Sequence, residues 1–213
     1  MVSCPNVHDT AWSLMSEESR WELYEELPHL EQRRPLWETL DDELAVERVL
    51  YPGSYVDISP SFVFRDVTYS DMDQRCPAFF ADEAVQQRVP YSFQFIHGDY
   101  REPLEVAPVD LLLSQYAGPI SHYCKQYVRL GGHLLVNNSH ADAGVAALDP
   151  DWELVGVMRG SRISRAVEGY FEPKPGRVAD REEMIESMKP VGYTKTASNY
   201  LFRLDSTDNA HNE

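Results

Sequence analysis

The side chains best suited to proton transfer and hydrogen bonding stand together in one short segment, Asn137-Asn138-Ser139-His140-Ala141-Asp142. His140 is a candidate general base, because an imidazole exchanges its proton near neutral pH. Asp142 is expected to orient that imidazole, and the amides and the hydroxyl of residues 137–139 are expected to bind a substrate. The competing interpretation is a strand-to-helix connection in which Asn138 or Ser139 caps a helix over residues 140–148. For His140 the structural role is the favoured one.

A second polar segment, residues 114–119, directly follows the nearly continuous apolar run of residues 109–113. Such a run is typical of a central strand that is covered on both faces. In open α/β sheets, ligands bind beyond the carboxyl ends of the strands. Ser114 and Tyr116 are therefore candidates for a site, with Ser114 toward a cofactor and Tyr116 toward a substrate.

Two acids and one glycine follow earlier strand-like runs. Gly53 and Ser54 end the run that begins at Val49, Asp71 ends the next run, and Asp99 follows Gly98. A glycine permits close approach of the backbone to a ligand, and an acid at a strand end accepts hydrogen bonds from ribose hydroxyls. The alternatives are that Asp71 merely ends its strand and that Asp99 is a solvated turn residue.

After Val49 the sequence alternates short runs rich in β-forming residues with helical segments, and this pattern predicts a mostly parallel sheet. The expected strands cover residues 47–51, 67–71, 92–97, 109–115, 133–138, 152–158 and 198–204. Helices are expected at 73–85, 119–130 and 180–189, and Gly131-Gly132 is expected to stop the second of them. The last two strands are expected to pair antiparallel. The fold class is thus α/β, a Rossmann-like sheet of about seven strands.

The amino-terminal segment differs in composition, since residues 1–50 hold twelve acidic and four basic side chains. Its pattern predicts two amphipathic helices, a first one that ends near Pro28 and a second one that runs from about Pro35 to Ala45. We expect residues 1–45 to form an acidic helical arm packed on a domain of residues 46–205, with a flexible tail at 206–213. The basic cluster of Arg159, Arg162 and Arg165 is expected to be solvated or to pair with nearby acids, those of the arm included. The alternative is that it binds an anionic group of a substrate.

The order of the strand endings, acids and glycines described above resembles that of class I S-adenosylmethionine-dependent methyltransferases. In that family the first strand ends in a glycine-rich loop, the second in a ribose-binding acid and the third in an acid near the adenine, and a Gly-Gly turn precedes the fifth. Gly53, Asp71, Asp99 and Gly131-Gly132 match these positions. The loop departs from the family pattern, because Tyr51 and Pro52 occupy the place of the family's acid and only one glycine remains.

The resemblance implies methyl transfer from S-adenosylmethionine to a small-molecule acceptor. It assigns Gly53, Ser54, Asp71, Asp99 and Ser114 to the cofactor, and it assigns the loops at residues 114–119 and 137–142 to the acceptor, with His140 and Tyr116 as catalytic candidates. The alternative is a non-catalytic binding or scaffold module in which bulky loop residues fill the pocket. A dinucleotide-dependent oxidoreductase fits less well, because Gly-x-Gly-x-x-Gly is absent.

Composition excludes several other classes. A net charge of −16 disfavours nucleic acids and anionic membranes as partners. No apolar run approaches the roughly 18–20 residues that a membrane helix needs, and we expect a cytoplasmic protein. The three widely spaced cysteines, Cys4, Cys76 and Cys124, and the scattered histidines form neither a disulfide framework nor a zinc pattern.

Overall fold

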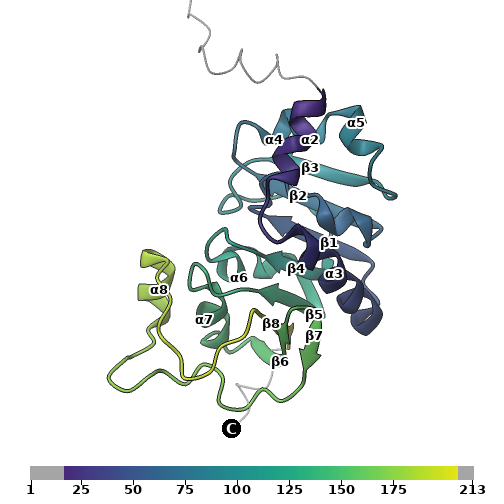
Figure 1. Ribbon diagram of the computed structural model, residues 1–213. Helices are drawn as coiled ribbons and strands as arrows, with labels where there is room; N and C mark the ends of the chain where they lie inside the picture. Colours follow the sequence, from purple (N-terminus) through teal and green to yellow (C-terminus); the bar gives the residue numbers. More distant parts are fainter. Residues whose placement is uncertain (1–16, 206–213) are drawn as a thin grey trace, which may run out of the picture.

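The computed structural model describes residues 17–205, which build one eight-stranded sheet with the order β3-β2-β1-β4-β5-β8-β6-β7 (Figure 1). The strands are β1 (Arg48–Pro52), β2 (Asp66–Asp71), β3 (Phe93–His97), β4 (Val109–Ser114), β5 (Val128–Val136), β6 (Trp152–Arg159), β7 (Arg162–Ser164) and β8 (Asn199–Leu204). The strands β1 to β5 run parallel, and β8 pairs antiparallel with both β5 and β6. The predicted fold class and the antiparallel terminal pair are confirmed.

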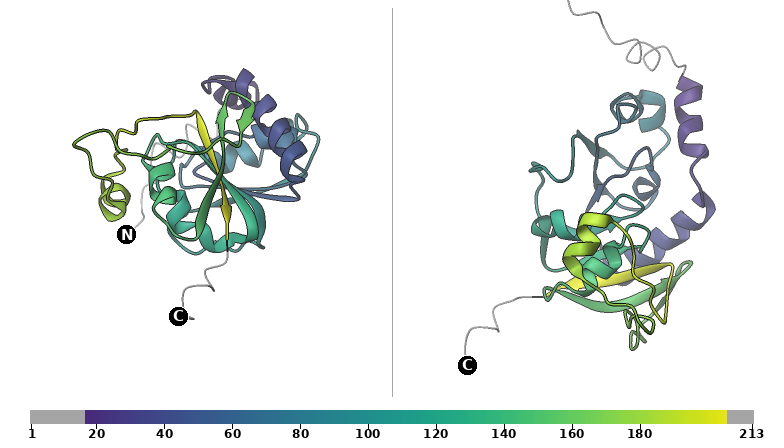
Figure 2. Two further views of the ribbon diagram at one scale, coloured as in Figure 1. Left: turned by 90° about the horizontal axis from the view of Figure 1, so that it is seen from below. Right: turned by 90° about the vertical axis from the view of Figure 1, so that its left-hand side faces the viewer.

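Helices cover both faces of this sheet (Figure 2). They are α2 (Glu17–Glu25), α3 (Leu30–Leu44), η1 (Ser59–Phe62), α4 (Cys76–Phe80), α5 (Glu83–Gln86), α6 (Ile120–Tyr123), η2 (Lys125–Tyr127), α7 (Asp142–Ala147) and α8 (Arg181–Ser187). Alternate residues of one strand enter different cores: Leu111 and Leu113 of β4 face the core under the arm, whereas Leu112 faces the core with α6 and α7. The continuous apolar run of β4 follows from burial on both faces. No helix in residues 17–205 is long and apolar enough to span a membrane.

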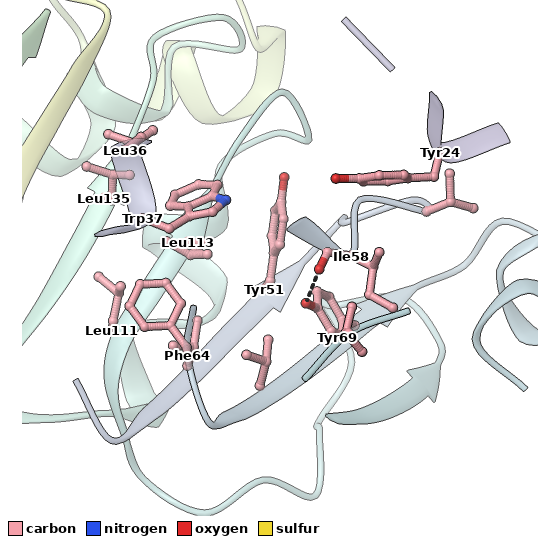
Figure 3. Packing of buried hydrophobic residues seen from close by; sticks show 14 of the residues in the cluster. Tyr24, Leu36, Trp37, Tyr51, Ile58, Phe64, Tyr69, Leu111, Leu113 and Leu135 are labelled. Carbon is pink, nitrogen blue, oxygen red and sulfur yellow. Dashed lines mark hydrogen bonds between the residues drawn. The ribbon is translucent and has the colours of Figure 1, made fainter. Parts of the chain in front are cut away.

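The arm helices α2 and α3 are part of the larger core. Trp37 and Leu40 of α3 are fully buried there, and Trp37 lies beside the strand residues Leu113 and Tyr51 (Figure 3). The indole Nε1 of Trp37 donates a hydrogen bond to Ser59 Oγ at 2.9 Å, so the polar atom of this large side chain is satisfied. The arm therefore contributes apolar surface that the sheet needs for its own burial.

Two ion pairs fix the ends of the arm. Arg20 of α2 pairs with the buried Asp82 at 2.6 Å, and Glu43 of α3 pairs with Arg165 at 2.9 Å. The second pair agrees with the predicted pairing for Arg165, whereas Arg159 of the same cluster donates to Thr196 O at 3.0 Å.

Four predicted helical features were wrong. The second arm helix begins at Leu30, so that Pro35 lies inside α3 and does not start it. The expected helix at 73–85 is two short helices, because Asp82 ends the first and caps the second by accepting a hydrogen bond from Ala84 N. The expected helix at 119–130 ends early, and β5 already begins at Val128. Gly131-Gly132 therefore lies inside β5, where Gly131 has φ 75° and the register against β4 shifts. The short strand β7, formed after a turn at Gly160, was not predicted.

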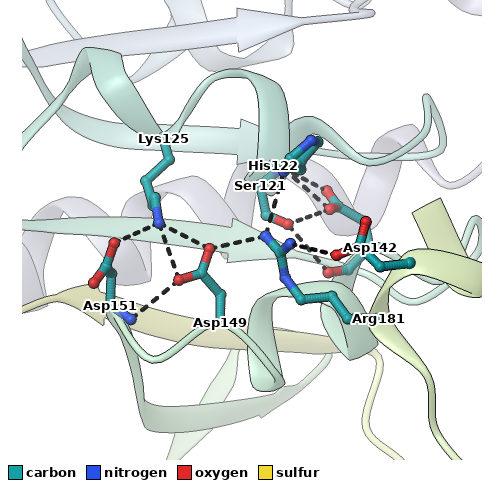
Figure 4. Close-up of polar contacts among 8 residues, drawn as sticks. Ser121, His122, Lys125, Asp142, Asp149, Asp151 and Arg181 are labelled. Atoms are coloured by element: carbon teal, nitrogen blue, oxygen red, sulfur yellow. Dashed lines mark hydrogen bonds and ion pairs between the residues drawn. The ribbon is translucent and has the colours of Figure 1, made fainter.

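The loops beyond β4 and β5 are joined by the buried carboxylate of Asp142 (Figure 4). It accepts hydrogen bonds from Ser114 Oγ at 2.5 Å and from Ser121 Oγ at 2.5 Å, and Ser121 N donates to it at 3.1 Å. Complete burial raises the pKa of Asp142 to about 6, and the serine hydrogen bonds oppose that rise only in part. The segments after β4 and β5 are thus connected through a carboxyl group whose ionisation is disfavoured by its burial.

The long connection between β7 and β8 is attached to the sheet domain by α8. Arg181 Nη2 pairs with Asp149 at 3.0 Å and contacts His122 Nδ1 at 3.3 Å, and Lys125 Nζ binds Asp149 from the other side at 2.8 Å (Figure 4). Met184 of α8 is buried against α7. These contacts hold α8 beside the loop that follows β5.

We expect Trp37→Ala to lower the free energy of unfolding by about 3–5 kcal/mol, because it removes a fully buried indole and leaves Ser59 Oγ without its donor. Urea unfolding followed by circular dichroism measures the change. The exposed Leu130→Ala is the control, with an expected change within about 0.5 kcal/mol. Equal stability of the two variants would contradict the assignment of the arm to the core.

We expect Asp142→Asn to change how stability depends on pH. A folded-state pKa raised to about 6 means that Asp142 stabilises the fold most below pH ~4 and that this contribution is lost as pH rises through about 6. The stability of the wild type relative to Asp142→Asn should therefore fall over that window, by on the order of 3 kcal/mol. Urea unfolding of both proteins between about pH 4 and pH 7 tests this expectation. It would be refuted if the free energies of unfolding of the two proteins changed in parallel with pH.

Candidate functional site

The carboxyl edge of the parallel strands gathers most of the predicted site residues. Gly53 follows β1 with φ 63°, and its N–H donates to Ser70 O at 2.7 Å. A Cβ added at this position would overlap the Cβ of Ala117 in the loop after β4. The glycine therefore permits close contact between the loops of β1 and β4, the two central strands between which an open α/β sheet places its ligand.

Asp71 lies at the end of β2 in a fixed orientation. Tyr55 N donates to its Oδ2 at 2.7 Å, and Asp73 N donates to its Oδ1 at 2.8 Å. An ionised carboxylate offers about four lone-pair sites, so each oxygen keeps capacity for one further donor. The half-buried Asp71 can thus still accept hydrogen bonds from ribose hydroxyls.

Tyr55 of the first loop has φ 48°, a conformation in which glycine is favoured. Its ring lies under the guanidinium of Arg75, with 4.5 Å between Arg75 Cζ and the ring centroid. Arg75 in turn binds Asp73 at 2.6 Å, and this hydrogen-bonded pair lowers the pKa of Asp73. The bulky residue in the glycine loop is therefore held against the end of β2.

The residues beyond Asp71 form an open surface. Met72 is 60% exposed and offers an apolar face beside Asp71. Asp99 follows β3 and binds Arg101, whose Nε donates to it at 2.9 Å, and the hydrogen bonds from Arg101 lower the pKa of Asp99. The hydroxyl of Tyr100 donates to Ala117 O at 3.3 Å. The two predicted acids and Met72 could hold a nucleoside at this edge.

Ser54 and Ser114, also predicted to bind the cofactor, are directed inward. Ser54 is buried, and its hydroxyl donates to Tyr55 O at 3.3 Å. The Ser114 hydroxyl is used by Asp142. Their roles in the structure are to shape the loops after β1 and β4.

The segment 137–142 is divided between two surroundings. Asn138 Oδ1 accepts a hydrogen bond from Gly144 N in the first turn of α7 at 3.1 Å. The helix starts only at Asp142 and its N-cap is Ala141, so neither Asn138 nor Ser139 holds the cap position that was predicted. His140 Nδ1 meets the exposed Ser139 Oγ at 3.0 Å. Asp142 is turned to Ser114 and Ser121, so the expectation that it orients His140 was wrong. The imidazole has no carboxylate partner among residues 17–205.

A cavity of about 360 Å³ lies at the carboxyl end of β4, under the arm. Its lining residues come from four segments far apart in sequence and are His29, Gln32, Arg33, Leu36, Trp37, Gln115, Tyr116, Gly160, Ser198 and Asn199. Of the predicted residues, only Tyr116 lines it, with φ 64° and 57% of the side chain exposed. The other lining residues were not predicted from the sequence, in which the polarity of the strand endings was the one signal that pointed toward them.

A chain of amide side chains borders this cavity. Asn137 Nδ2 donates to Gln115 Oε1 at 3.2 Å, and Gln115 Nε2 donates to Asn199 Oδ1 at 2.9 Å. It links the ends of β4 and β5 to the start of β8, which runs antiparallel and therefore begins at the same edge. No group of acids, histidines and cysteines in the described part of the chain could hold a metal ion.

Two solved structures are similar to this chain over nearly its whole length. The O-methyltransferase TomG from Streptomyces achromogenes, in complex with S-adenosylmethionine, has a TM-score of 0.52 at 11% identity and covers 97% of this chain and 92% of its own. An O-methyltransferase from Bacillus cereus, in complex with S-adenosylhomocysteine, has a TM-score of 0.50 at 10% identity, with 96% and 94% covered. No protein-family model and no curated protein matches the chain. Together with the strand order, these likenesses show that the chain has the Rossmann-like fold of class I S-adenosylmethionine-dependent methyltransferases.

Proposed function

We propose that this protein binds S-adenosylmethionine and transfers its methyl group to a small-molecule acceptor. The observation that carries the proposal is the arrangement at the carboxyl edge, where the fixed acid Asp71 and the open Met72 follow β2 and the loop after β1 meets the loop after β4 at Gly53 and Ala117. The loop after β4 also lines a cavity. The two similar structures, in complex with S-adenosylmethionine and with S-adenosylhomocysteine, support the choice of cofactor.

The residues suit the nucleoside half of that cofactor. Asp71 would accept hydrogen bonds from the ribose, Met72 would pack on the adenine, and Asp99 would accept from the exocyclic amine of the adenine. Gly53 and Ser54 would lie near the methionine half. When bound, S-adenosylmethionine supplies a methyl group on a positively charged sulfur.

The acceptor would occupy the cavity under the arm. Tyr116 and the amide chain that begins at Asn137 would orient it there, and Asn138, Ser139 and Asp142 would act by shaping the adjoining loop. His140 does not line this cavity, so we do not assign it the task of removing a proton. The buried free thiols of Cys76 and Cys124 suit a reducing, cytoplasmic setting.

The second candidate function is a non-catalytic binding module. It is favoured by the contact that fills the space beside Gly53, because Ala117 occupies the volume into which a ligand could approach that glycine. The positive φ of Tyr55, with Arg75 over its ring, likewise fills the loop with side chains. The two candidates differ in whether the cofactor binds.

We expect calorimetry to show S-adenosylhomocysteine binding to the wild type, and Asp71→Asn to weaken it at least about tenfold, because a carboxylate-to-hydroxyl hydrogen bond is worth about 1.5–3 kcal/mol. Asp66→Asn is the matched control, since it makes the same change at the exposed opposite end of β2. Its affinity should equal that of the wild type.

Absence of heat at about millimolar ligand would refute methyl transfer and leave the binding module. Equal weakening by the two variants would refute the role of Asp71.

A further inference from the structure

The cavity under the arm differs in charge from the rest of the protein. The chain has a net charge of −16, yet none of the aspartates and glutamates whose side chains the structure describes lines this cavity. Its polar side chains are instead an arginine, a histidine, amides, the phenol of Tyr116 and a serine hydroxyl. A negatively charged ligand would therefore meet no carboxylate among the described residues that line the cavity, although the chain as a whole is acidic.

The hydrogen bonds of the amide chain run from Asn137 through Gln115 to Asn199, and this order leaves hydrogen-bond donors at the cavity. Each amide oxygen along it is used, because Asn137 Oδ1 accepts from Ser139 N, Gln115 Oε1 accepts from Asn137, and Asn199 Oδ1 accepts from Gln115. The Nδ2 group of Asn199, at the end of the chain, donates to no acceptor within residues 17–205. The chain therefore ends on N–H groups at the cavity wall.

Arg33 supplies further donors from the opposite wall. Its Nη1 binds the buried Asp57, whose carboxylate also accepts from Tyr51 OH at 3.0 Å and from Ser59 Oγ at 2.6 Å. The Nε and Nη2 groups of Arg33 donate to no acceptor in the described part of the chain. The guanidinium is thus held in place by Asp57 and keeps donors for a planar oxyanion.

The remaining walls limit the ligand to a small apolar body. Leu36 and Trp37 of α3 form one side, Tyr116 forms another, and about 360 Å³ is near the lower end of the range for small-molecule sites. An acceptor that is already ionised at neutral pH needs no base, which agrees with the position of His140 outside the cavity.

We propose that the cavity binds a small carboxylate-bearing molecule with a planar apolar body, held by the Gln115–Asn199 amide chain and Arg33. The proposal rests on the proposed function, because it names the chemical class of the acceptor. It is also a statement about binding that does not require the cofactor.

Titration with benzoate tests it, with benzamide and benzylamine as isosteric neutral and cationic probes. In ¹H–¹⁵N spectra of the full chain, benzoate should shift the side-chain amides of Gln115 and Asn199 with a Kd of roughly 1 mM, as expected for so small a ligand. Benzamide should bind at least about tenfold more weakly, and benzylamine should not shift these signals. Equal binding of the three probes, or no shift with benzoate at about 20 mM, overturns the proposal.

Two variants place a carboxylate on the cavity wall, Asn199→Asp and Gln115→Glu. Each should weaken benzoate binding at least about tenfold through like-charge repulsion. Gln126→Glu makes the same charge change on the exposed surface of η2, outside the cavity lining, and should leave the Kd unchanged. Should one cavity variant fail to fold by circular dichroism, the other decides, and unchanged affinity in a folded variant overturns the proposal.

Calorimetry with S-adenosylhomocysteine separates this proposal from the methyl-transfer proposal. Benzoate binding without cofactor binding supports the anion site and refutes methyl transfer. Cofactor binding without a preference for benzoate leaves methyl transfer standing and overturns the anion site.

Discussion

The buried carboxylate of Asp57 is the contact on which the rest of the site depends. It receives the phenol of Tyr51 from the end of β1, the hydroxyl and the N–H of Ser59 from η1, and the guanidinium of Arg33 from the arm. A buried charge is stable only when it is paired and fully hydrogen-bonded, and Asp57 meets both conditions through three separate elements. One carboxylate therefore fixes the first loop and docks the arm at the same time.

This arrangement explains how the loop after β1 keeps its conformation with a single glycine. Burial next to Asp57 raises the pKa of Tyr51 to about 12 and keeps its phenol as a neutral donor. The loop is then stabilised by side chains, whereas a glycine-rich loop is stabilised through its backbone and a ligand. Asp71 is fixed by the same loop through Tyr55 N. The surface at Asp71 and the cavity under the arm are therefore both bordered by one hydrogen-bonded loop.

Much of the fold could be predicted from the sequence, because strands with continuous apolar runs are recognisable without tertiary information. The apolar stripe at Ile120, Tyr123 and Cys124 marks residues of a real core, but it does not reveal that the helix stops after one turn. Gly131-Gly132 reads as a stop signal, whereas in the fold it lets β5 bulge past Asp110, whose carboxylate binds Arg129. Glycine marks unusual backbone in both cases, and only the pairing partner distinguishes them.

The site was less predictable for a different reason. The positions of Asp71 and Asp99 after their strands could be predicted because strand endings are local features. The partners of Asp142 lie 21 and 28 positions away, and the cavity brings the arm together with residue 199. Such contacts depend on the arrangement of distant segments, which composition and periodicity do not encode.

The arm forms one wall of the cavity and also completes the core. Binding of a ligand in the cavity is therefore coupled to docking of the arm on the sheet. A molecule bound between α3 and β4 would contact the docked arm and would lose its site if the arm detached. By mass action, such a ligand stabilises the docked state by RT ln(1 + [L]/Kd). Occupancy of the cavity would then be detectable at a distance, as slower amide exchange in α2 and α3, including residues that never touch the ligand.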